Sequence, residues 1–394
     1  MKVFLAFFLV MVAAFVGYHL SFRRVAAGRS AAGWFPLTGL EFLVIGLLLG
    51  PMFFNVLDPQ TSRSLEPLSA LVLGWIGMLL GFQFEITTLR KFPPYYFAAM
   101  LIESGAAIVI TMACLYLLLP LFVDIGPTPR LITAMALSAA AACTAQSGLA
   151  LVEAGKARAH AGLLRLLRYL AGLDGLLPMF LLVLIYFIKP HPSGGVFSGT
   201  LQFLAVLTAV LLIYALFLIQ RRAGDELAMV VIGMTVLASG AAMISGFSPL
   251  VANFLIGCCL VNATLEKEKI FALLVSVEKP VYLILLIFAG AQWHIEGAGI
   301  LLPALVYCLI RTAAKSAGGY AAVKSLALLD RFPRGLGLGL LEQGGLPIAI
   351  LFDFQQRFSG QSIGYAVGFA LAGIVAADLL SRFSLGLLFR KAAA

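Results

Sequence analysis

Asp174 lies near the middle of an apolar run, residues 163–188, that is long enough to cross a lipid bilayer. A carboxylate at that depth is costly, and proteins keep one there when it carries protons or cations or pairs with a buried base. Two bases, Arg311 and Lys315, lie inside another apolar run, residues 301–320. One acid and two bases at membrane depth are typical of ion transport.

Burial favours the neutral form of a carboxylate, so Asp174 is expected to take up a proton on one side of the membrane and release it on the other. In its ionised form it would bind a monovalent cation, Na⁺ or K⁺. Oxygen ligands suit these ions, and Thr144, Gln146, Ser147 and carbonyl groups freed by local unwinding of the same segment could supply them. The alternative is a structural Asp174 that is permanently paired with one of the two bases.

Arg311 and Lys315 are four residues apart, so on a helix they share one face and repel each other. They need acidic partners, and Asp174, Glu103 and Glu342 are the candidates. We expect Lys315 to be the functional base, because a buried lysine can lose its proton whereas arginine cannot; alternatively, it extends to the cytoplasmic interface. Arg311 is expected to form a permanent ion pair. Glu103 is its favoured partner, with a second proton site as the alternative role.

Composition places the chain in a membrane. Of 394 residues, 62% are hydrophobic and only 11% are charged, and the mean hydropathy is +1.03. That leaves too little polar surface for a soluble protein of this length. The net charge of +9 does not indicate nucleic acid, because the basic residues are scattered through short loops. No Gly-rich phosphate loop is present, so we expect no cofactor, no soluble domain and no enzymatic activity.

A membrane-spanning helix needs about 20 apolar residues, and the sequence contains thirteen such segments. It therefore predicts an all-α polytopic membrane protein with about thirteen transmembrane helices. The predicted spans are residues 3–21, 35–54, 68–84, 95–123, 131–152, 163–188, 201–220, 227–245, 249–264, 271–293, 300–320, 336–352 and 363–388.

The basic residues predict the orientation. With the N-terminus outside, 18 of the 27 Lys and Arg residues lie in cytoplasmic loops, 5 lie outside and 4 lie within spans. Basic residues accumulate on the cytoplasmic side of membrane proteins. We therefore expect a multi-pass protein of the inner (plasma) membrane with its C-terminus in the cytoplasm.

Two of the spans are interrupted by polar and small residues. The fifth contains Ser138 and the stretch up to residue 148, and the twelfth contains Glu342, Gln343, Gly344 and Gly345. The two lie seven spans apart, an odd number, so they cross the membrane in opposite senses, as an inverted repeat requires. We expect repeats over residues 35–190 and 247–394, linking helices over 191–246 and an extra N-terminal helix and loop over 1–34. Each interruption could instead be a helix-packing surface.

Six short stretches together resemble the monovalent cation:proton antiporter superfamily, most closely its Kef-type potassium-efflux branch. Specificity comes from their order and spacing over most of the chain. The stretches are residues 38–39 (TG), 45–51 (IGLLLGP), 136–138 (ALS), 174–178 (DGLLP), 278–280 (EKP) and 342–345 (EQGG).

The resemblance implies a fold with two crossed, broken helices and a dimerising panel beside a moving core, hence a homodimer in the lipid bilayer. It also implies alternating access for a cation and protons, and a basic residue in the helix that carries Arg311 and Lys315. The sequence departs from the family at two places. Leu173 stands where a polar residue or second acid often precedes the aspartate, and Leu346 and Pro347 stand where an acid commonly follows the Gln-Gly-Gly pattern.

These observations predict a secondary active transporter that exchanges Na⁺ or K⁺ for H⁺. One alternative is a cation-coupled symporter of a small organic solute. Another is a non-transporting membrane subunit or sensor on the same fold, which Leu173 favours.

Overall fold

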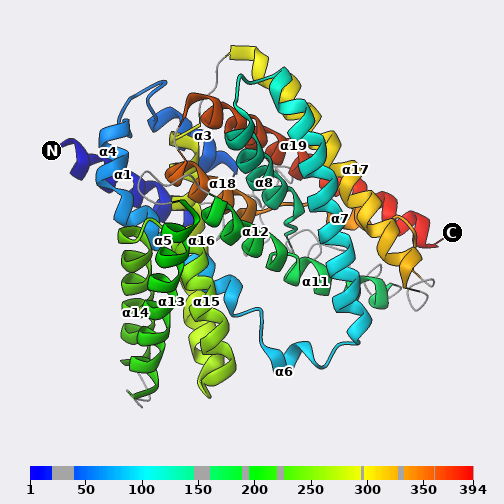
Figure 1. Cartoon of the computed structure of the whole chain (residues 1–394), viewed down its shortest axis with the longest axis horizontal. Helices are drawn as coiled ribbons and strands as arrows, with labels where there is room; N and C mark the ends of the chain where they lie inside the picture. Colours follow the sequence, from blue (N-terminus) through cyan, green and yellow to red (C-terminus); the bar gives the residue numbers. More distant parts are fainter. Residues whose placement is uncertain are drawn as a thin grey trace. The chain divides into compact units, whose positions relative to one another are not determined.

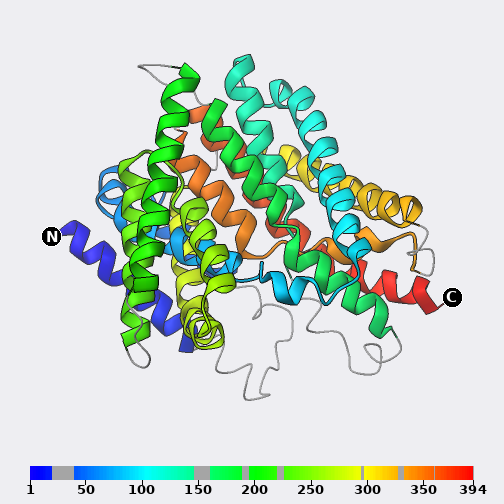
Figure 2. The same cartoon turned by 60° about the horizontal axis from the view of Figure 1, so that its bottom comes forward.

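The computed structural model describes residues 1–19, 40–145, 160–188, 195–219, 226–293, 297–326, 332–358 and 360–393. Every regular element in these residues is a helix, as Figures 1 and 2 show. The all-α fold class predicted from hydropathy is therefore confirmed.

Each of the thirteen predicted spans contains at least one helix. Five helical stretches in the described residues are both long and apolar enough to cross a membrane: Pro94–Leu121, Ala161–Ile188, Leu227–Ile244, Lys267–Ala291 and Gln361–Gly386. The second of them contains a two-residue turn. Four shorter apolar helices lie at Lys2–Gly17, Glu66–Gly81, Leu204–Leu216 and Pro249–Ala263. Of the remaining four spans, the fifth and twelfth are interrupted, the helix Leu301–Ser325 carries buried charges, and the described part of the second is the short helix Leu40–Leu49.

The chain divides into two compact units, and each takes helices from both halves of the sequence. The first comprises Met1–Glu85 and Pro190–His294, and the second comprises Ile86–Lys189 and Ile295–Ala394. Both charged spans identified in the sequence belong to the second unit.

The first unit is a helical bundle in which α13, α14 and α15 pack on one another (Figure 1). Helix α5 packs on α15, and α3 packs on α16. Its helices are α1 (Lys2–Gly17), α3 (Leu40–Leu49), α4 (Pro59–Ser64), α5 (Glu66–Gly81), α13 (Gly195–Ile219), α14 (Glu226–Ile244), α15 (Pro249–Ala263) and α16 (Lys267–Ala291).

Glycines bring two pairs of helices in this unit into backbone contact. A Cβ atom at Gly46 of α3 would lie 2.1 Å from the Ile287 carbonyl oxygen of α16, and one at Gly77 of α5 would lie 2.1 Å from the Leu250 carbonyl oxygen of α15. Gly50 and Gly81, each four residues further on, make similar approaches. This small-xxx-small spacing is typical of closely packed membrane helices.

The second unit carries the interrupted helices. Helix α7 runs along α17 and also packs on α8, while α19 packs on α17. Its helices are α6 (Ile86–Leu89), α7 (Pro94–Leu118), η2 (Leu119–Leu121), α8 (Pro127–Ala142), α11 (Ala161–Leu173), α12 (Leu176–Ile188), η3 (Gly297–Ile300), α17 (Leu301–Ser325), η5 (Leu336–Leu340), α18 (Gly345–Arg357) and α19 (Gln361–Ala393).

We predict that Gly77→Ala destabilises the first unit, because the added methyl group would have to push the α15 backbone away. Overpacking of this kind typically costs about 1–3 kcal/mol. The matched control is Gly240→Ala in α14, where an added Cβ meets nothing within 4 Å. There alanine should be neutral or stabilising by up to about 1 kcal/mol through its helix propensity. Thermal unfolding in detergent compares the variants, and an equal transition temperature for both would contradict the close packing of α5 on α15.

Candidate functional site

Helix α8 stops inside the predicted fifth span. It ends at Ala142, and Cys143 is extended, with φ −67° and ψ 143°. Ser138 is still helical and its hydroxyl donates to the Met135 carbonyl oxygen at 2.8 Å, so the interruption begins later than the sequence predicted. Cys143 and Thr144 are weaker helix formers than the run of alanines before them. Gln146 and Ser147, which were predicted as cation ligands, lie outside the described residues.

The twelfth span is also broken, between η5 and α18. Residues 341–344 are irregular, and Gly344 has φ +64° and ψ −148°, a conformation that is essentially restricted to glycine. Helix α18 then begins at Gly345, with Pro347 in its first turn, where a missing N–H costs nothing. The Gly-Gly pair and the proline therefore produce the break that the sequence predicted here.

The two interruptions cross each other. The Ala145 N–H donates to the Glu342 carbonyl oxygen at 2.8 Å, and the Thr144 hydroxyl donates to the Leu340 carbonyl oxygen at 3.2 Å. A Cβ atom at Gly344 would lie only 2.7 Å from the Ala145 Cβ, so the crossing itself requires glycine. Two crossed, broken helices, as the resemblance implied, are thus present in the second unit.

A third interruption lies at Asp174 itself. The predicted sixth span is two helices, because α11 ends at Leu173 and α12 begins at Leu176. Pro178 has no N–H to bond to the Asp174 carbonyl oxygen four residues earlier, and the Ser104 hydroxyl donates to that oxygen at 3.4 Å instead. Asp174 and Gly175 form the turn between the two helices, and Gly175 and Pro178 are the sequence signal for this break within the predicted span.

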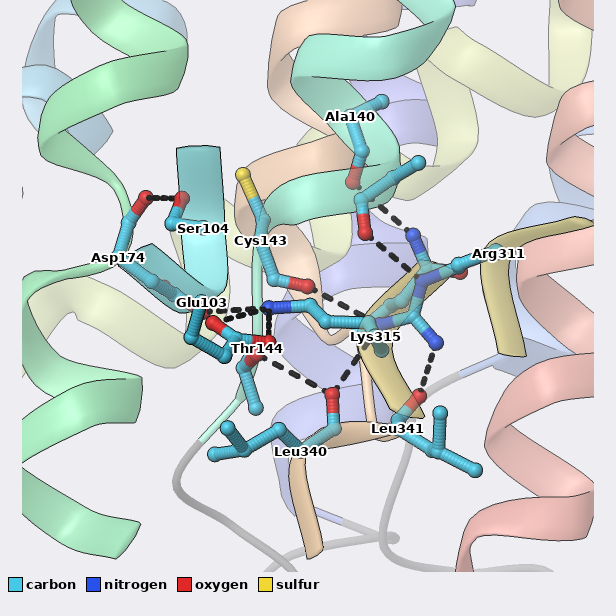
Figure 3. Close-up of polar contacts among 12 residues, drawn as sticks. Glu103, Ser104, Ala140, Cys143, Thr144, Asp174, Arg311, Lys315, Leu340 and Leu341 are labelled. Atoms are coloured by element: carbon cyan, nitrogen blue, oxygen red, sulfur yellow. Dashed lines mark hydrogen bonds and ion pairs between the residues drawn. The ribbon is translucent and has the colours of Figure 1, made fainter. Parts of the chain in front are cut away.

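Arg311 holds the first two interruptions together (Figure 3). Its guanidinium is fully buried and donates to four carbonyl oxygens: from Nε to Ala141 at 3.0 Å, from Nη1 to Leu341 at 2.6 Å, and from Nη2 to Cys143 at 3.1 Å and Leu340 at 3.4 Å. Two of these groups belong to the end of α8 and two to the end of η5. The positive charge therefore meets the negative ends of two helical segments.

This geometry corrects two expectations. Within the described residues, the ion pairs of the site involve Lys315, and Arg311 is bound by backbone carbonyl groups rather than by Glu103. Carbonyl groups freed by the unwinding of this segment were expected to be available to a cation. Two carbonyl groups at the end of α8, those of Ala141 and Cys143, are instead bonded to the guanidinium.

Lys315 lies between two acids from different helices, as Figure 3 shows. Its ammonium nitrogen is 3.1 Å from Glu103 Oε1 on α7 and 3.3 Å from Asp174 Oδ2 at the α11–α12 break. The side chains of Lys315, Glu103 and Asp174 are exposed by no more than 2%. The alternative in which Lys315 extends to the membrane interface is therefore wrong.

Close backbone approaches fix the position of Lys315. A Cβ atom at Gly318, three residues further along α17, would lie 2.5 Å from the Glu103 carbonyl oxygen. One at Gly337 in η5 would lie 2.0 Å from the carbonyl oxygen of Lys315 itself. Larger residues at these two glycines would push α7 and η5 away from α17. The glycines thus allow three elements to meet around one ammonium group.

Asp378 of α19 has a role that the sequence did not predict. Its carboxylate accepts a hydrogen bond from the Gln343 N–H at 2.7 Å, just before α18 begins. The Gln343 side chain donates in turn to the Ala140 carbonyl oxygen at 3.1 Å. An acid is stabilised near the start of a helix, so the Gly-Gly-x-Pro start of α18 was a signal for such a partner.

Glu342 is placed at the crossing by its backbone, through the carbonyl group that bonds to Ala145. Its side chain is partly exposed, unlike those of Glu103 and Asp174. Thr144 follows Cys143 at the end of α8, and its hydroxyl donates to the Leu340 carbonyl oxygen, which leaves the oxygen lone pairs available to a cation. The site can therefore offer a carboxylate and a hydroxyl oxygen to a cation, beside an ammonium group that competes for the same carboxylate.

No protein-family model matches the sequence, and no curated protein does. The fold is similar to that of the sodium/proton antiporter MjNhaP1 from Methanocaldococcus jannaschii at pH 8. The TM-score is 0.68, the sequence identity is 16%, and the match covers 100% of both chains. At this identity the match shows a shared antiporter fold, and function has to be argued from the site.

We predict that Arg311→Lys destabilises the second unit strongly, because one ammonium group cannot reach four carbonyl groups that converge on a planar guanidinium. Each carbonyl left unbonded in the interior costs roughly 1–3 kcal/mol. The control is Arg130→Lys, where the arginine donates to one side chain, the Tyr116 hydroxyl, at 3.0 Å. The unfolding temperature in detergent measures the difference. A variant at residue 311 as stable as the control would show that the guanidinium does not hold the crossing.

Proposed function

We propose that the protein is a secondary active transporter that exchanges a monovalent cation, Na⁺ or K⁺, for H⁺ by alternating access. The observation that carries the proposal is the contact of Lys315 with Asp174, 3.3 Å long and buried, beside the crossing of two interrupted helices. The shared antiporter fold supports it.

Asp174 has two ways to lose its contact with Lys315 without leaving a bare buried charge. It can take up a proton, or it can bind a cation through its carboxylate with the Thr144 hydroxyl as a further ligand. The two states exclude each other at one carboxylate. Each time the site changes the side of the membrane that it faces, it therefore carries either a proton or a cation. This competition is sufficient to couple the two fluxes.

The position of Asp174 at a helix break suits this role. The chain bends between Leu173 and Leu176, and the peptide carbonyl of Asp174 is bonded to a side chain of α7 instead of to its own helix. In the interior of a membrane, irregular backbone is tolerated where it is buried in protein or lines a cavity. Small shifts between helices at such a point would change which side of the membrane reaches the carboxylate.

Several finer features belong to the same proposal. They are the relation to the Kef-type branch of the superfamily, the homodimer, the inner-membrane location, and the orientation with the N-terminus outside and the C-terminus in the cytoplasm.

The division into inverted repeats over residues 35–190 and 247–394 is supported by two packing pairs, α3 with α16 and α5 with α15. Mapping the second to sixth spans onto the ninth to thirteenth makes α3 correspond to α15 and α5 to α16. The pair α3–α16 then becomes the pair α15–α5.

Transport assays in proteoliposomes separate this function from its two alternatives. Dequenching of an internal pH dye on addition of Na⁺ or K⁺ would support exchange. Cation-dependent uptake of a small organic solute, without such a signal, would support a symporter. Absence of both would support a non-transporting subunit or sensor.

Asp174→Asn should abolish exchange while leaving the protein folded, because the amide has nearly the shape of the carboxylate but neither titrates nor binds cations strongly. Lys315 keeps Glu103 as an acidic partner in this variant. Asp378→Asn is a useful control, since Asp378 contacts the start of α18 and not Lys315. The assay is cation-driven proton flux, with size-exclusion behaviour in detergent as the folding check. Retention of most of the flux by Asp174→Asn would show that this carboxylate is not the carrier.

Exchange should also be electroneutral, because a single carrier carboxylate moves one proton one way and one monovalent cation the other. We expect the equilibrium pH gradient in proteoliposomes to be independent of an imposed membrane potential. A cycle that moved one net charge would respond by about 2.3 kcal/mol per 100 mV. A clear dependence of the equilibrium gradient on voltage would contradict one-for-one exchange and assign a second proton to Lys315.

A further inference from the structure

Glu103 has no part in the exchange described so far, yet it lies as close to Lys315 as Asp174 does. Its Oε1 and Oε2 atoms are 3.1 Å and 3.3 Å from the ammonium nitrogen, and the side chain is fully buried. A buried carboxylate in a membrane protein is costly unless it has a task. Glu103 is thus a second acid on Lys315, and its role requires an explanation.

Lys315 contacts two carboxylates in the described residues, those of Glu103 from α7 and Asp174 from the α11–α12 break. Cys143 at the end of α8 and Arg311 on α17 are the neighbouring titratable and charged groups. The guanidinium of Arg311 is taken up by four carbonyl groups. Two carboxylates therefore face one available ammonium group.

The presence of two carboxylates for one ammonium group determines what happens when a cation binds. A cation at Asp174 replaces the ammonium group as the partner of that carboxylate, and Glu103 still neutralises Lys315. Without Glu103, a cation and an ammonium group would share one carboxylate in a medium of low dielectric constant, where like charges repel strongly. The least costly escape would be loss of the lysine proton.

We propose that Glu103 is a positioning residue that keeps Lys315 protonated through the whole cycle, so that the proton exchanged for the cation is that of Asp174. The inference rests on the proposed exchange function. In the intact protein, one O–H bond of Asp174 breaks as one cation binds, and the three N–H bonds of Lys315 are unchanged. In Glu103→Gln, the proton released on cation binding would come from Lys315, and exchange would remain one for one.

Close packing explains why Glu103 can hold this place. Gly318 lets α17 approach the backbone of Glu103 one turn from Lys315, so the carboxylate and the ammonium group are held by two continuous helices. Asp174, by contrast, lies at a helix break. The pair proposed to stay together, Glu103 and Lys315, is thus built on two unbroken helices. The carboxylate proposed to change partners, that of Asp174, lies at the helix break.

The test is the pH dependence of the cation KM in proteoliposomes for four proteins: wild type, Glu103→Gln, Glu103→Asp and the double variant Glu103→Gln with Lys315→Gln. For Glu103→Gln we expect a rise in KM of at least about tenfold at neutral pH, the factor that corresponds to one unit of pKa. The KM should recover at alkaline pH as Lys315 loses its proton, while the maximal rate changes less. Glu103→Asp keeps the charge and should retain the wild-type profile.

The double variant provides the control for structure. It removes the base together with the acid, so no lysine proton is left to lose, and its KM should lack the additional recovery at alkaline pH that is expected of Glu103→Gln alone. Cation-dependent thermal stabilisation in detergent reports binding by all four proteins without any need for transport.

Two results would overturn the inference while leaving exchange intact. One is a Glu103→Gln variant whose KM follows the wild-type pH profile. The other is a Glu103→Gln variant that loses maximal rate equally at every pH and whose KM does not recover at alkaline pH, which is the pattern of a purely structural role. Failure of the proposed function would look different, since the wild type itself would then show no cation-driven proton flux.

Discussion

Backbone that unwinds inside a membrane has to find its hydrogen-bond partners within the protein, because hydrocarbon offers none. The hydrogen bonds of Arg311 meet this requirement for both crossed interruptions at once, with donors to Ala141 and Cys143 on one side and to Leu340 and Leu341 on the other. The arrangement is mutual, since the converging ends of α8 and η5 supply the negative potential that makes a buried guanidinium tolerable. Arg311 thus fixes the crossing together with the Ala145–Glu342 and Thr144–Leu340 hydrogen bonds, and the site beside it depends on that geometry.

A division of labour between the two bases follows from this contact. They lie four residues apart on α17, yet one is neutralised by backbone dipoles and the other by carboxylates. Because Arg311 needs no acid, both Glu103 and Asp174 are left to Lys315. A permanently charged, planar group suits the fixed structural position. A group with a single rotatable ammonium suits the position where partners are proposed to change.

Hydropathy was sufficient to locate the membrane helices, and polar or small residues at 138–148 and 342–345 marked two of the breaks, since both signals are local. The break at Asp174 was also marked locally, by Gly175 and Pro178, but a continuous apolar run concealed it. The partners of Arg311 and Lys315 could not be predicted in the same way. Helical spacing places the two bases on one face, but the level at which α7 and η5 reach that face depends on close approaches at Gly318 and Gly337. Those approaches are properties of the assembled unit.

Leu173 occupies a place where the family resemblance implies a polar residue or a second acid. Leu173 is 3% exposed and ends α11, and the second acid of the site comes instead from α7, as Glu103. The site therefore contains two carboxylates even though only one lies in the Asp-Gly-Leu-Leu-Pro stretch. Their settings differ, because Asp174 lies at a break whose carbonyl is bonded across to Ser104, whereas Glu103 lies within an unbroken helix. An acid at a helix break and an acid on an unbroken helix, facing one lysine, suit the two tasks proposed for them: exchange of a proton for a cation by the first, and a constant charge on the base through the second.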